Sequence, residues 1–370
     1  MHKIKQHSNK VTPFVFPFFL SALSLSAQAT GLNFWESSSS NSALASANGA
    51  KASDASVLAL APSSITQLDN PTVTANVTYY QVSTDYYLFG SETDYKQADP
   101  IPAGFFSMPV SDNWYLGLAI YSRTAADISV PQIVLSPETR VRPITVSIAP
   151  TLAYRWNDVS IGLTVESLQS QYLLEQEVCT IRCRDNKIEG TTSGWSGAIS
   201  ATWQASPTFA IAATHRLASQ YSDANIEFDL PDITSLYTTW SPLKNLDWHT
   251  SYSYTQWQGK GIRYTDYNDV IGLLVGASDS QRFATSLNYH IASWDLRVGL
   301  SLDEAIDAFG GNDIRYRVGA GYQFNTNWRT DISFVFEDYA RKEYNTSAGD
   351  ALVAVQNEGF AAGLGLTYTF

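Results

Sequence analysis

The sequence predicts an all-β protein: a transmembrane antiparallel β-barrel of about 14 strands with a short, partly helical N-terminal hatch in its lumen. Three observations predict this fold class: a C-terminal segment of alternating apolar and small or polar residues, a series of similar segments, and an export signal at the N-terminus. Alternation with a period of two is typical of a β-strand whose faces meet different surroundings.

The last twelve residues form the clearest of these strands. Glycine and threonine occupy one face, and the other face holds Phe360, Ala362, Leu364, Leu366, Tyr368 and Phe370. A final strand that ends on an aromatic residue is typical of bacterial outer-membrane barrels. It predicts a location in the outer membrane of a Gram-negative cell, with membrane lipid and the barrel assembly machinery as partners.

Residues 1–29 have the pattern of a secretory signal peptide. Lys3, Lys5 and Lys10 form a basic start, residues 14–25 are largely apolar, and Ala27-Gln28-Ala29 is a small-residue cleavage site. The apolar run is too short to cross about 30 Å of hydrocarbon as a helix. Removing residues 1–29, which hold three lysines and no acidic residue, lowers the formal charge from −12 to −15.

The composition restricts the class of protein further. The acidic balance argues against nucleic acid as a partner. After the signal the sequence has no run of 18 or more apolar residues, so it predicts no spanning helix, and a closed barrel remains because backbone groups in hydrocarbon must all be paired. The 21 Tyr, 10 Trp and 17 Phe suit aromatic girdles.

Fourteen segments have strand character, and their connections alternate between short and long. This alternation is typical of an outer-membrane barrel, whereas a secreted β-sandwich, the other reading of this composition, would have Greek-key connections. The predicted strands are 72–82, 102–110, 113–123, 143–155, 158–168, 188–205, 207–220, 231–241, 245–257, 281–291, 293–302, 313–324, 327–338 and 358–370.

The faces of these strands predict which side chains meet lipid. In 293–302 the apolar residues alternate with Asp295, Arg297 and Asp303, so the charged set must face the lumen. A polar interior is expected of any such barrel, so we interpret the lumen charges as a structural network rather than catalytic groups. These charges are Glu166, Asp247, His249, Arg297, Arg315, Arg317, Arg329, Asp331 and Glu337.

The sequence contains no signature of an enzyme. A nucleophile elbow, a clustered metal-ligand spacing and a phosphate-binding loop are all missing from it. We therefore predict no catalytic residues, no cofactor and no metal.

Two cysteines, Cys179 and Cys183, lie close together in a predicted loop at 169–187. An exported protein reaches an oxidising compartment, so a local disulfide is the leading interpretation. A metal site, which would need further ligands, and two free thiols are the alternatives. The same loop holds Tyr172, Leu173 and Leu174, whose apolar character predicts a groove for a hydrophobic ligand.

Residues 30–71 precede the first strand and do not alternate. A Ser-rich stretch favours a disordered leader, but Phe34, Trp35 and the apolar cluster at 57–60 have no reason to be exposed. We therefore expect this segment to fold into short helices that plug the lumen, ahead of a barrel at 72–370.

A set of short motifs runs along the chain: Gly31, Glu36, Gly49-Ala50, Ala52, Asp54-Ala55, Pro62 and Ile65-Thr66, and farther on the hairpin at 106–120, Ala149-Pro150-Thr151-Leu152-Ala153-Tyr154 and Tyr254-Thr255-Gln256-Trp257. Together these motifs resemble the long-chain fatty acid outer-membrane transporters, the FadL/TodX family. The chain departs from the family pattern at Ala61-Pro62-Ser63, where the family has Asn-Pro-Ala, and at Gly31-Leu32, where it has Gly-Phe.

The resemblance implies a passive outer-membrane diffusion channel for long-chain fatty acids or similar hydrophobic molecules. The ligand would be captured by extracellular loops, held near the hatch and released laterally beside a kinked strand. The expected pocket residues are Leu32, Phe34, Trp35, Leu58, Leu60 and Ile65, with a hatch turn at Ala61, Pro62 and Ser63. The protein would act as a monomer. A general porin and a structural or adhesive barrel are the alternatives.

Overall fold

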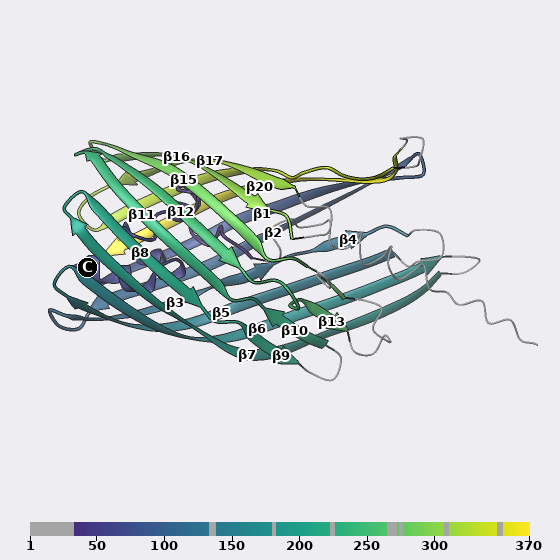
Figure 1. The fold of residues 1–370 in the computed structure, drawn as a ribbon, viewed down its shortest axis with the longest axis horizontal. Helices are drawn as coiled ribbons and strands as arrows, with labels where there is room; N and C mark the ends of the chain where they lie inside the picture. Colours follow the sequence, from purple (N-terminus) through teal and green to yellow (C-terminus); the bar gives the residue numbers. More distant parts are fainter. Residues whose placement is uncertain are drawn as a thin grey trace, which may run out of the picture.

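The computed structural model describes residues 33–132, 138–179, 183–222, 226–264, 272–273, 277–306, 311–345 and 351–370. In these residues fourteen strands pair in sequence order as an antiparallel barrel, which closes where the last strand pairs with the first (Figure 1). The predicted fold class is confirmed. No helix in the described ranges is long and apolar enough to cross a membrane.

The wall strands agree with the predicted segments in number and order. They are β1 (Thr72–Leu88), β2 (Ser91–Pro109), β3 (Trp114–Ala125), β5 (Glu138–Trp156), β6 (Val159–Cys179), β7 (Cys183–Ser206), β8 (Phe209–Arg216), β11 (Ile233–Leu243), β12 (Leu246–Thr255), β15 (Ser280–Ile291), β16 (Trp294–Glu304), β17 (Asn312–Gln323), β18 (Trp328–Asp338) and β20 (Ala351–Thr369).

Six shorter strands lie in the connections between wall strands. They are β4 (Ile128–Val130), β9 (Ser219–Ser222), β10 (Ile226–Leu230), β13 (Ile262–Tyr264), β14 (Gly272–Leu273) and β19 (Lys342–Asn345). β4 pairs with β5 and β19 with β20, while the other four form a small separate sheet. All of these connections belong to the long set that the sequence predicts.

The two faces of the wall are oriented as the alternation predicts. Along β16 and β17, Leu296, Val298 and Tyr316 are exposed, whereas Arg297 and Arg317 are buried. The reverse orientation would put arginines into hydrocarbon, at a cost of about 2–4 kcal/mol each near the bilayer midplane.

A ring of exposed tryptophans marks one end of the barrel. Each lies beside a short turn, and the set comprises Trp114, Trp156, Trp240, Trp248, Trp294 and Trp328. Tryptophan favours the membrane–water interface because its ring is apolar and its N–H is polar. These residues therefore form the aromatic girdle at the short-turn end.

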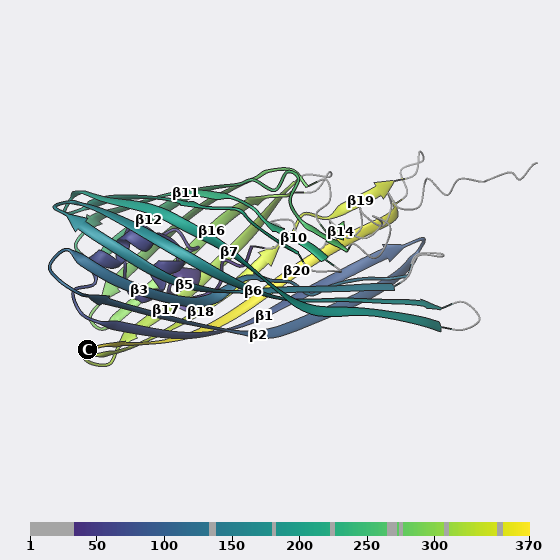
Figure 2. The ribbon, with the colours of Figure 1, turned by 90° about the horizontal axis from the view of Figure 1, so that it is seen from below.

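Two hairpins extend far past the predicted strand ends. β1 and β2 remain paired up to Leu88 and Ser91, and β6 and β7 up to Cys179 and Cys183 (Figures 1 and 2). The prediction of loops at 83–101 and 169–187 was therefore wrong. Beyond the membrane the outer face no longer needs apolar side chains, so the lipid pattern stops although the hydrogen-bonded ladder continues.

Residues 33–71, here called the lumen segment, lie inside the barrel near its short-turn end (Figure 2). They contain α2 (Ser39–Ala43) and the 3-10 helices η1 (Ala55–Ala59) and η2 (Pro62–Gln67). Two wall glycines allow the close approach: a Cβ at Gly162 would lie 2.6 Å from the Ser63 nitrogen, and one at Gly319 would lie 2.5 Å from the Cβ of Ala43.

The closing strand generates the first prediction. The Phe370 N–H donates to the Pro71 carbonyl oxygen at 3.0 Å, and Tyr368 packs against Trp328 with 4.7 Å between ring centroids. Deleting residues 368–370 removes these contacts and leaves part of β1 and β18 unpaired in the membrane. We expect loss of the heat-modifiable band on gels. Phe370→Trp, which keeps the aromatic end, should retain it, and normal folded barrel after the deletion would contradict the prediction.

Candidate functional site

The barrel wall contains a seam between β2 and β3. Their ladder runs only from Pro109 and Tyr115 to Gly104 and Ile120. Beyond that pair β3 continues with β5 and β2 continues with β1, but in the described residues no ladder joins β2 to β3. We call this stretch the β2–β3 seam.

The local sequence explains why the strands separate here. Pro100 and Pro102 have no N–H, so this stretch of β2 has two fewer donors to satisfy along an unpaired edge. On the other side, the register of β3 with β5 shifts between Ser122 and Thr124. The shift is a β-bulge at Arg123, and bulges bend the strand that contains them.

A cavity of about 400 Å³ occupies the seam. Its lining includes the inward-facing Ile101 and Ala103, and also Pro102, Gly104 and Ile120 from the outer face. Its lining therefore comes from both faces of the wall at the point where the two strands separate. We call it the wall pocket. Its volume lies in the range of small-molecule sites.

A second, smaller pocket of about 50 Å³ lies inside the barrel against the lumen segment. Phe34, Trp35 and Leu60 line it, so the structure brings these three predicted residues together. Leu58 and Ile65 instead pack against inward-facing side chains of β2, β3 and β5. Leu32 and the predicted signal peptide lie outside the described residues.

The predicted hatch turn forms the start of η2. Ala61 is its N-cap residue and Pro62 its first residue, where a missing N–H costs nothing. The Ser63 N–H donates to Ser200 Oγ at 2.8 Å, and the Ser63 hydroxyl lies 2.7 Å from Thr202 Oγ1. These contacts attach η2 to the lumen face of β7.

Two buried arginines border this lumen pocket and share one carboxylate. Arg123 Nη1 lies 2.5 Å from Glu166 Oε2, and Arg216 Nη1 lies 2.8 Å from Glu166 Oε1. All three side chains are less than a tenth exposed. The bulge at β3 therefore places a guanidinium group beside the pocket, and this trio carries one more positive than negative charge.

Phe34 connects the two pockets. Its N–H donates to the Arg123 carbonyl oxygen at 3.0 Å, next to an antiparallel bridge between Asn33 and Thr124. Its ring meets the Tyr80 ring edge to face at 5.6 Å, and Tyr80 lines the wall pocket. The beginning of the lumen segment is thus attached to β3 at its bulge.

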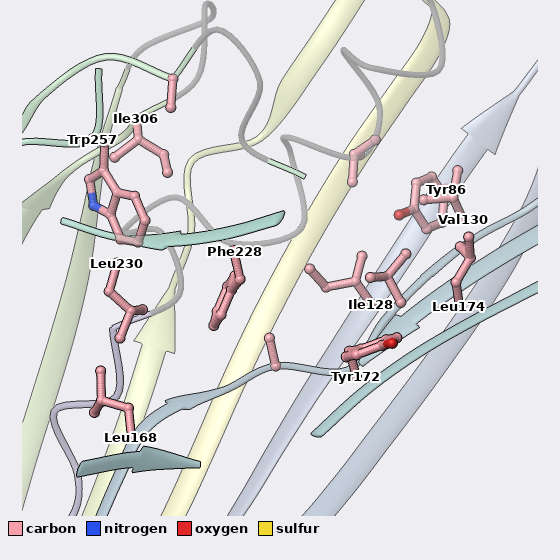
Figure 3. Close-up of a cluster of buried hydrophobic side chains, with 14 residues drawn as sticks. Tyr86, Ile128, Val130, Leu168, Tyr172, Leu174, Phe228, Leu230, Trp257 and Ile306 are labelled. Carbon is pink, nitrogen blue, oxygen red and sulfur yellow. The ribbon is translucent and has the colours of Figure 1, made fainter. Parts of the chain in front are cut away.

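Beyond the lumen segment the interior becomes apolar. A buried cluster there, shown in Figure 3, includes Tyr86, Ile128, Tyr172, Leu174, Phe228 and Trp257. We call it the upper apolar cluster. Tyr172 and Leu174 belong to it, whereas Leu173 lies on the opposite face of β6. Ala126 belongs to both this cluster and the wall pocket, so the two are continuous.

Tyr86 ties this cluster to β4. Its hydroxyl donates to the Ser129 carbonyl oxygen at 2.9 Å. Burial raises the pKa of the Tyr86 phenol, so the group stays protonated and remains a donor at any physiological pH.

At the tip of the β6–β7 hairpin, Cys183 is disulfide-bonded. The ladder places Cys179 directly opposite Cys183. Their bridge stays a prediction, because the Cys179 side chain lies outside what the structure describes. Within the described residues no group of three or more His, Cys, Asp or Glu could hold a metal ion.

The lumen segment is anchored in the barrel by a buried carboxylate. Glu36 Oε1 lies 2.9 Å from Arg317 Nη2 and 3.6 Å from Arg315 Nη1, and the three side chains are at most 3% exposed. The Arg282 guanidinium lies over the Trp35 ring at 4.7 Å. The sequence predicted Arg315 and Arg317 as lumen charges without finding Glu36 as their partner, and it did not identify Arg282.

Sequence reasoning also missed the residues that form the seam. Pro100 and Pro102 within one strand were a visible signal, since proline is confined to strand edges, but 83–101 was interpreted as a loop. Arg123 gave no such signal, because a bulge depends on the register with β5.

These features define the class of protein: a closed outer-membrane-type barrel with residues 33–71 in its lumen and a cavity where two wall strands separate. Residues 20–194 match the family model described as outer membrane protein transport protein (OMPP1/FadL/TodX). This match agrees with the resemblance noted in the sequence, and the matched model describes transport proteins. The family and the fold support a location in the outer membrane. No curated protein sequence matches the chain.

Solved structures share the fold at low sequence identity. A Pseudomonas aeruginosa FadL homologue aligns with a TM-score of 0.79 at 13% identity, covering 92% of this chain and 100% of its own. The Pseudomonas putida toluene transporter TodX gives 0.73 at 12%, covering 89% and 97%. The monoaromatic hydrocarbon channel CymD gives 0.68 at 11%, covering 93% and 98%.

The anchoring of the lumen segment generates the second prediction. Glu36→Gln leaves Arg315 and Arg317 without a carboxylate that both contact, and breaking a buried ion pair costs about 3–5 kcal/mol. We expect a lower urea midpoint and faster proteolysis within the lumen segment. The control is Glu343→Gln, which removes an exposed ion pair with Arg341 and should change stability by about 1 kcal/mol or less. Equal effects of the two substitutions would contradict the prediction.

Proposed function

We propose that the protein is a passive outer-membrane transporter for hydrophobic small molecules, which leave sideways through the β2–β3 seam. It would act as a monomer inserted by the barrel assembly machinery. The observation that carries this proposal is the wall pocket, whose lining comes from both faces of the wall. A cavity of this kind offers an apolar solute a route into the bilayer.

Transport along such a route needs no coupled energy source. Transfer from water to hydrocarbon releases about 0.8 kcal/mol per buried CH₂. The barrier for such a molecule is the polar, charged layer at the outer surface of the membrane. A protein that carries it past this layer and releases it laterally lets the transfer free energy drive uptake.

The path begins at the end with the long connections, which is the extracellular end in outer-membrane barrels. The upper apolar cluster, which contains Tyr172 and Leu174, would receive the ligand and pass it along Ala126 toward the seam. The lumen segment, within the predicted hatch at 30–71, would hold it at Phe34, Trp35 and Leu60. A shift of Asn33 and Phe34 away from β3 would then join the lumen to the wall pocket.

The charge beside the lumen pocket favours a ligand with an acidic head group. Among the ion pairs of the described residues, Arg123 and Arg216 share Glu166, and a carboxylate entering next to them would balance the remaining positive charge in a site of low dielectric. Long-chain fatty acids combine such a head group with an apolar chain. Arenes are the alternative cargo, since two of the related structures are described as a toluene transporter and a monoaromatic hydrocarbon channel.

A general porin is the second candidate function, and a structural or adhesive barrel the third. A porin needs an open aqueous lumen, whereas α2, η1 and η2 occupy the interior here. Glu36 attaches this segment to Arg317, and η2 is hydrogen-bonded to β7. A structural barrel would need neither a filled lumen nor a cavity between separated wall strands. Both observations favour the transporter.

The third prediction tests the lateral route. A Cβ at Gly104 would have no heavy atom within 4 Å, so Gly104→Trp should fill the wall pocket without disturbing the fold. We expect uptake of a fluorescent long-chain fatty acid to fall by about tenfold while gel migration stays heat-modifiable. Ala320→Trp is the matched control, because Ala320 faces outward on β17 away from the pocket. Uptake unchanged by Gly104→Trp would exclude the lateral route and favour a porin.

The fourth prediction tests the class of ligand. A charge-assisted hydrogen bond is worth about 1.5–3 kcal/mol, so a fatty acid should bind at least about tenfold more tightly than its methyl ester. Arg123→Met leaves Arg216 and Glu166 as a balanced pair and should abolish that preference. Arg341→Met, far from the pocket on the exposed surface, should keep it. Equal affinity of acid and ester in the unsubstituted protein would instead favour a neutral cargo.

A further inference from the structure

In the described residues no strand ladder joins the two sides of the seam at its extracellular end, and hydrogen bonds and ion pairs made by side chains join them instead. Arg142 Nη2 on β5 lies 2.8 Å from Asp99 Oδ1 on β2. Gln97 Nε2 lies 3.4 Å from Ser129 Oγ, and the Tyr86 hydroxyl reaches the Ser129 carbonyl. β2 and β5 are not neighbours in the sheet order, so the contact of Asp99 with Arg142 spans the opening.

A second ion pair fixes the arginine side of this contact. Arg140 donates to both oxygens of Asp127, at 2.8 and 2.6 Å, and Asp127 is only 7% exposed. Asp127 Oδ2 also lies 3.6 Å from Arg142 Nε. Asp127 follows the end of β3, so it holds the two β5 arginines against the bent strand.

We propose that Asp99, Asp127, Arg140 and Arg142 form an ionic clasp that holds the seam closed at its outer end and limits the size of the ligand that can leave through it. This inference rests on the proposed function. Asp99, Asp127 and Arg142 all line the wall pocket, so the clasp borders the route that the ligand would take.

The two halves of the clasp differ in how easily they separate. The pair of Arg140 with Asp127 is bidentate and its carboxylate is buried, which makes it the fixed half. Arg142 and Asp99 are each about a third exposed and share one short contact, which makes them the half that opens. An exposed pair of this kind is weak and is screened by salt.

Separating Arg142 from Asp99 would widen the wall pocket at its extracellular end. The ladder from Gly104 and Ile120 downward would stay intact, so the barrel would not unfold. β2 and β1 would move together, because their ladder is continuous from Thr72 to Leu88. The clasp would therefore set the width of the seam together with Phe34 of the lumen segment, which contacts Tyr80 on β1 and the Arg123 backbone on β3.

The distance across the seam tests the clasp without any ligand. Spin labels at Asp94→Cys on β2 and Glu177→Cys on β6, with Cys179 and Cys183 replaced by serine in every variant, report the separation of its two sides. We expect Asp99→Lys, which places two cations together, to lengthen and broaden the distance distribution. The double variant Asp99→Arg with Arg142→Asp should restore it. A distribution unchanged by Asp99→Lys would overturn the proposal, as would a double variant as broad as the single one.

Uptake measurements test the consequence for ligand size. Asp99→Lys should raise uptake of a fatty acid with a bulky fluorophore on the order of two- to fivefold, the range expected for a partly exposed ion pair. Uptake of an unlabelled fatty acid should change less. Added salt should raise bulky-ligand uptake in the unsubstituted protein but not in Asp99→Lys. Equal effects on both ligands would show that the clasp does not select ligands by size.

These results separate the clasp from the proposed function. If Gly104→Trp leaves uptake unchanged, the proposed lateral route is wrong. The distances between the spin labels then still show whether the clasp holds the seam closed. If Gly104→Trp blocks uptake and Asp99→Lys leaves the distances unchanged, the route stands and the clasp fails.

Discussion

Every part of this structure depends on one constraint: a backbone N–H or C=O group in hydrocarbon must be paired within the protein. This is why fourteen strands close on one another and why the last strand pairs with the first along its length. It also makes an opening in the wall costly. The β2–β3 seam is tolerated because Pro100 and Pro102 reduce the number of donors, and because Asn33 and Phe34 pair with β3 at its bulge.

The sequence predicted those features that follow from local alternation. Along β16 and β17 apolar and polar residues alternate because lipid and lumen impose opposite requirements on the two faces, and Leu296 and Arg297 show the result. The same reasoning failed at 83–101 and 169–187, where no lipid imposes a pattern although the ladders continue. A strand outside the membrane is held by its neighbours rather than by its own periodicity.

The candidate site was less predictable because it forms between distant segments. Phe34, Trp35 and Leu60 were identified as apolar residues in an unpatterned segment, but nothing local separates Leu60 from Leu58, and only the 3-10 turns place them in different surroundings. Arg123 and Glu166 are far apart in sequence and meet through the register of β3, β5 and β6. The wall pocket needs two strands to diverge, and a sequence pattern describes one strand at a time.

The lumen segment is held unevenly, and this limits which part of it can move. Glu36 lies between Arg315 and Arg317, Lys51 pairs with Asp247 at 2.8 Å, and η2 is bonded to β7. Ahead of Glu36, the described backbone is joined to β3 at Phe34 and Asn33. Moving those two residues breaks few contacts, whereas moving the whole segment would expose several buried charges. A local shift at Phe34 is therefore the less costly way to connect the lumen with the wall pocket.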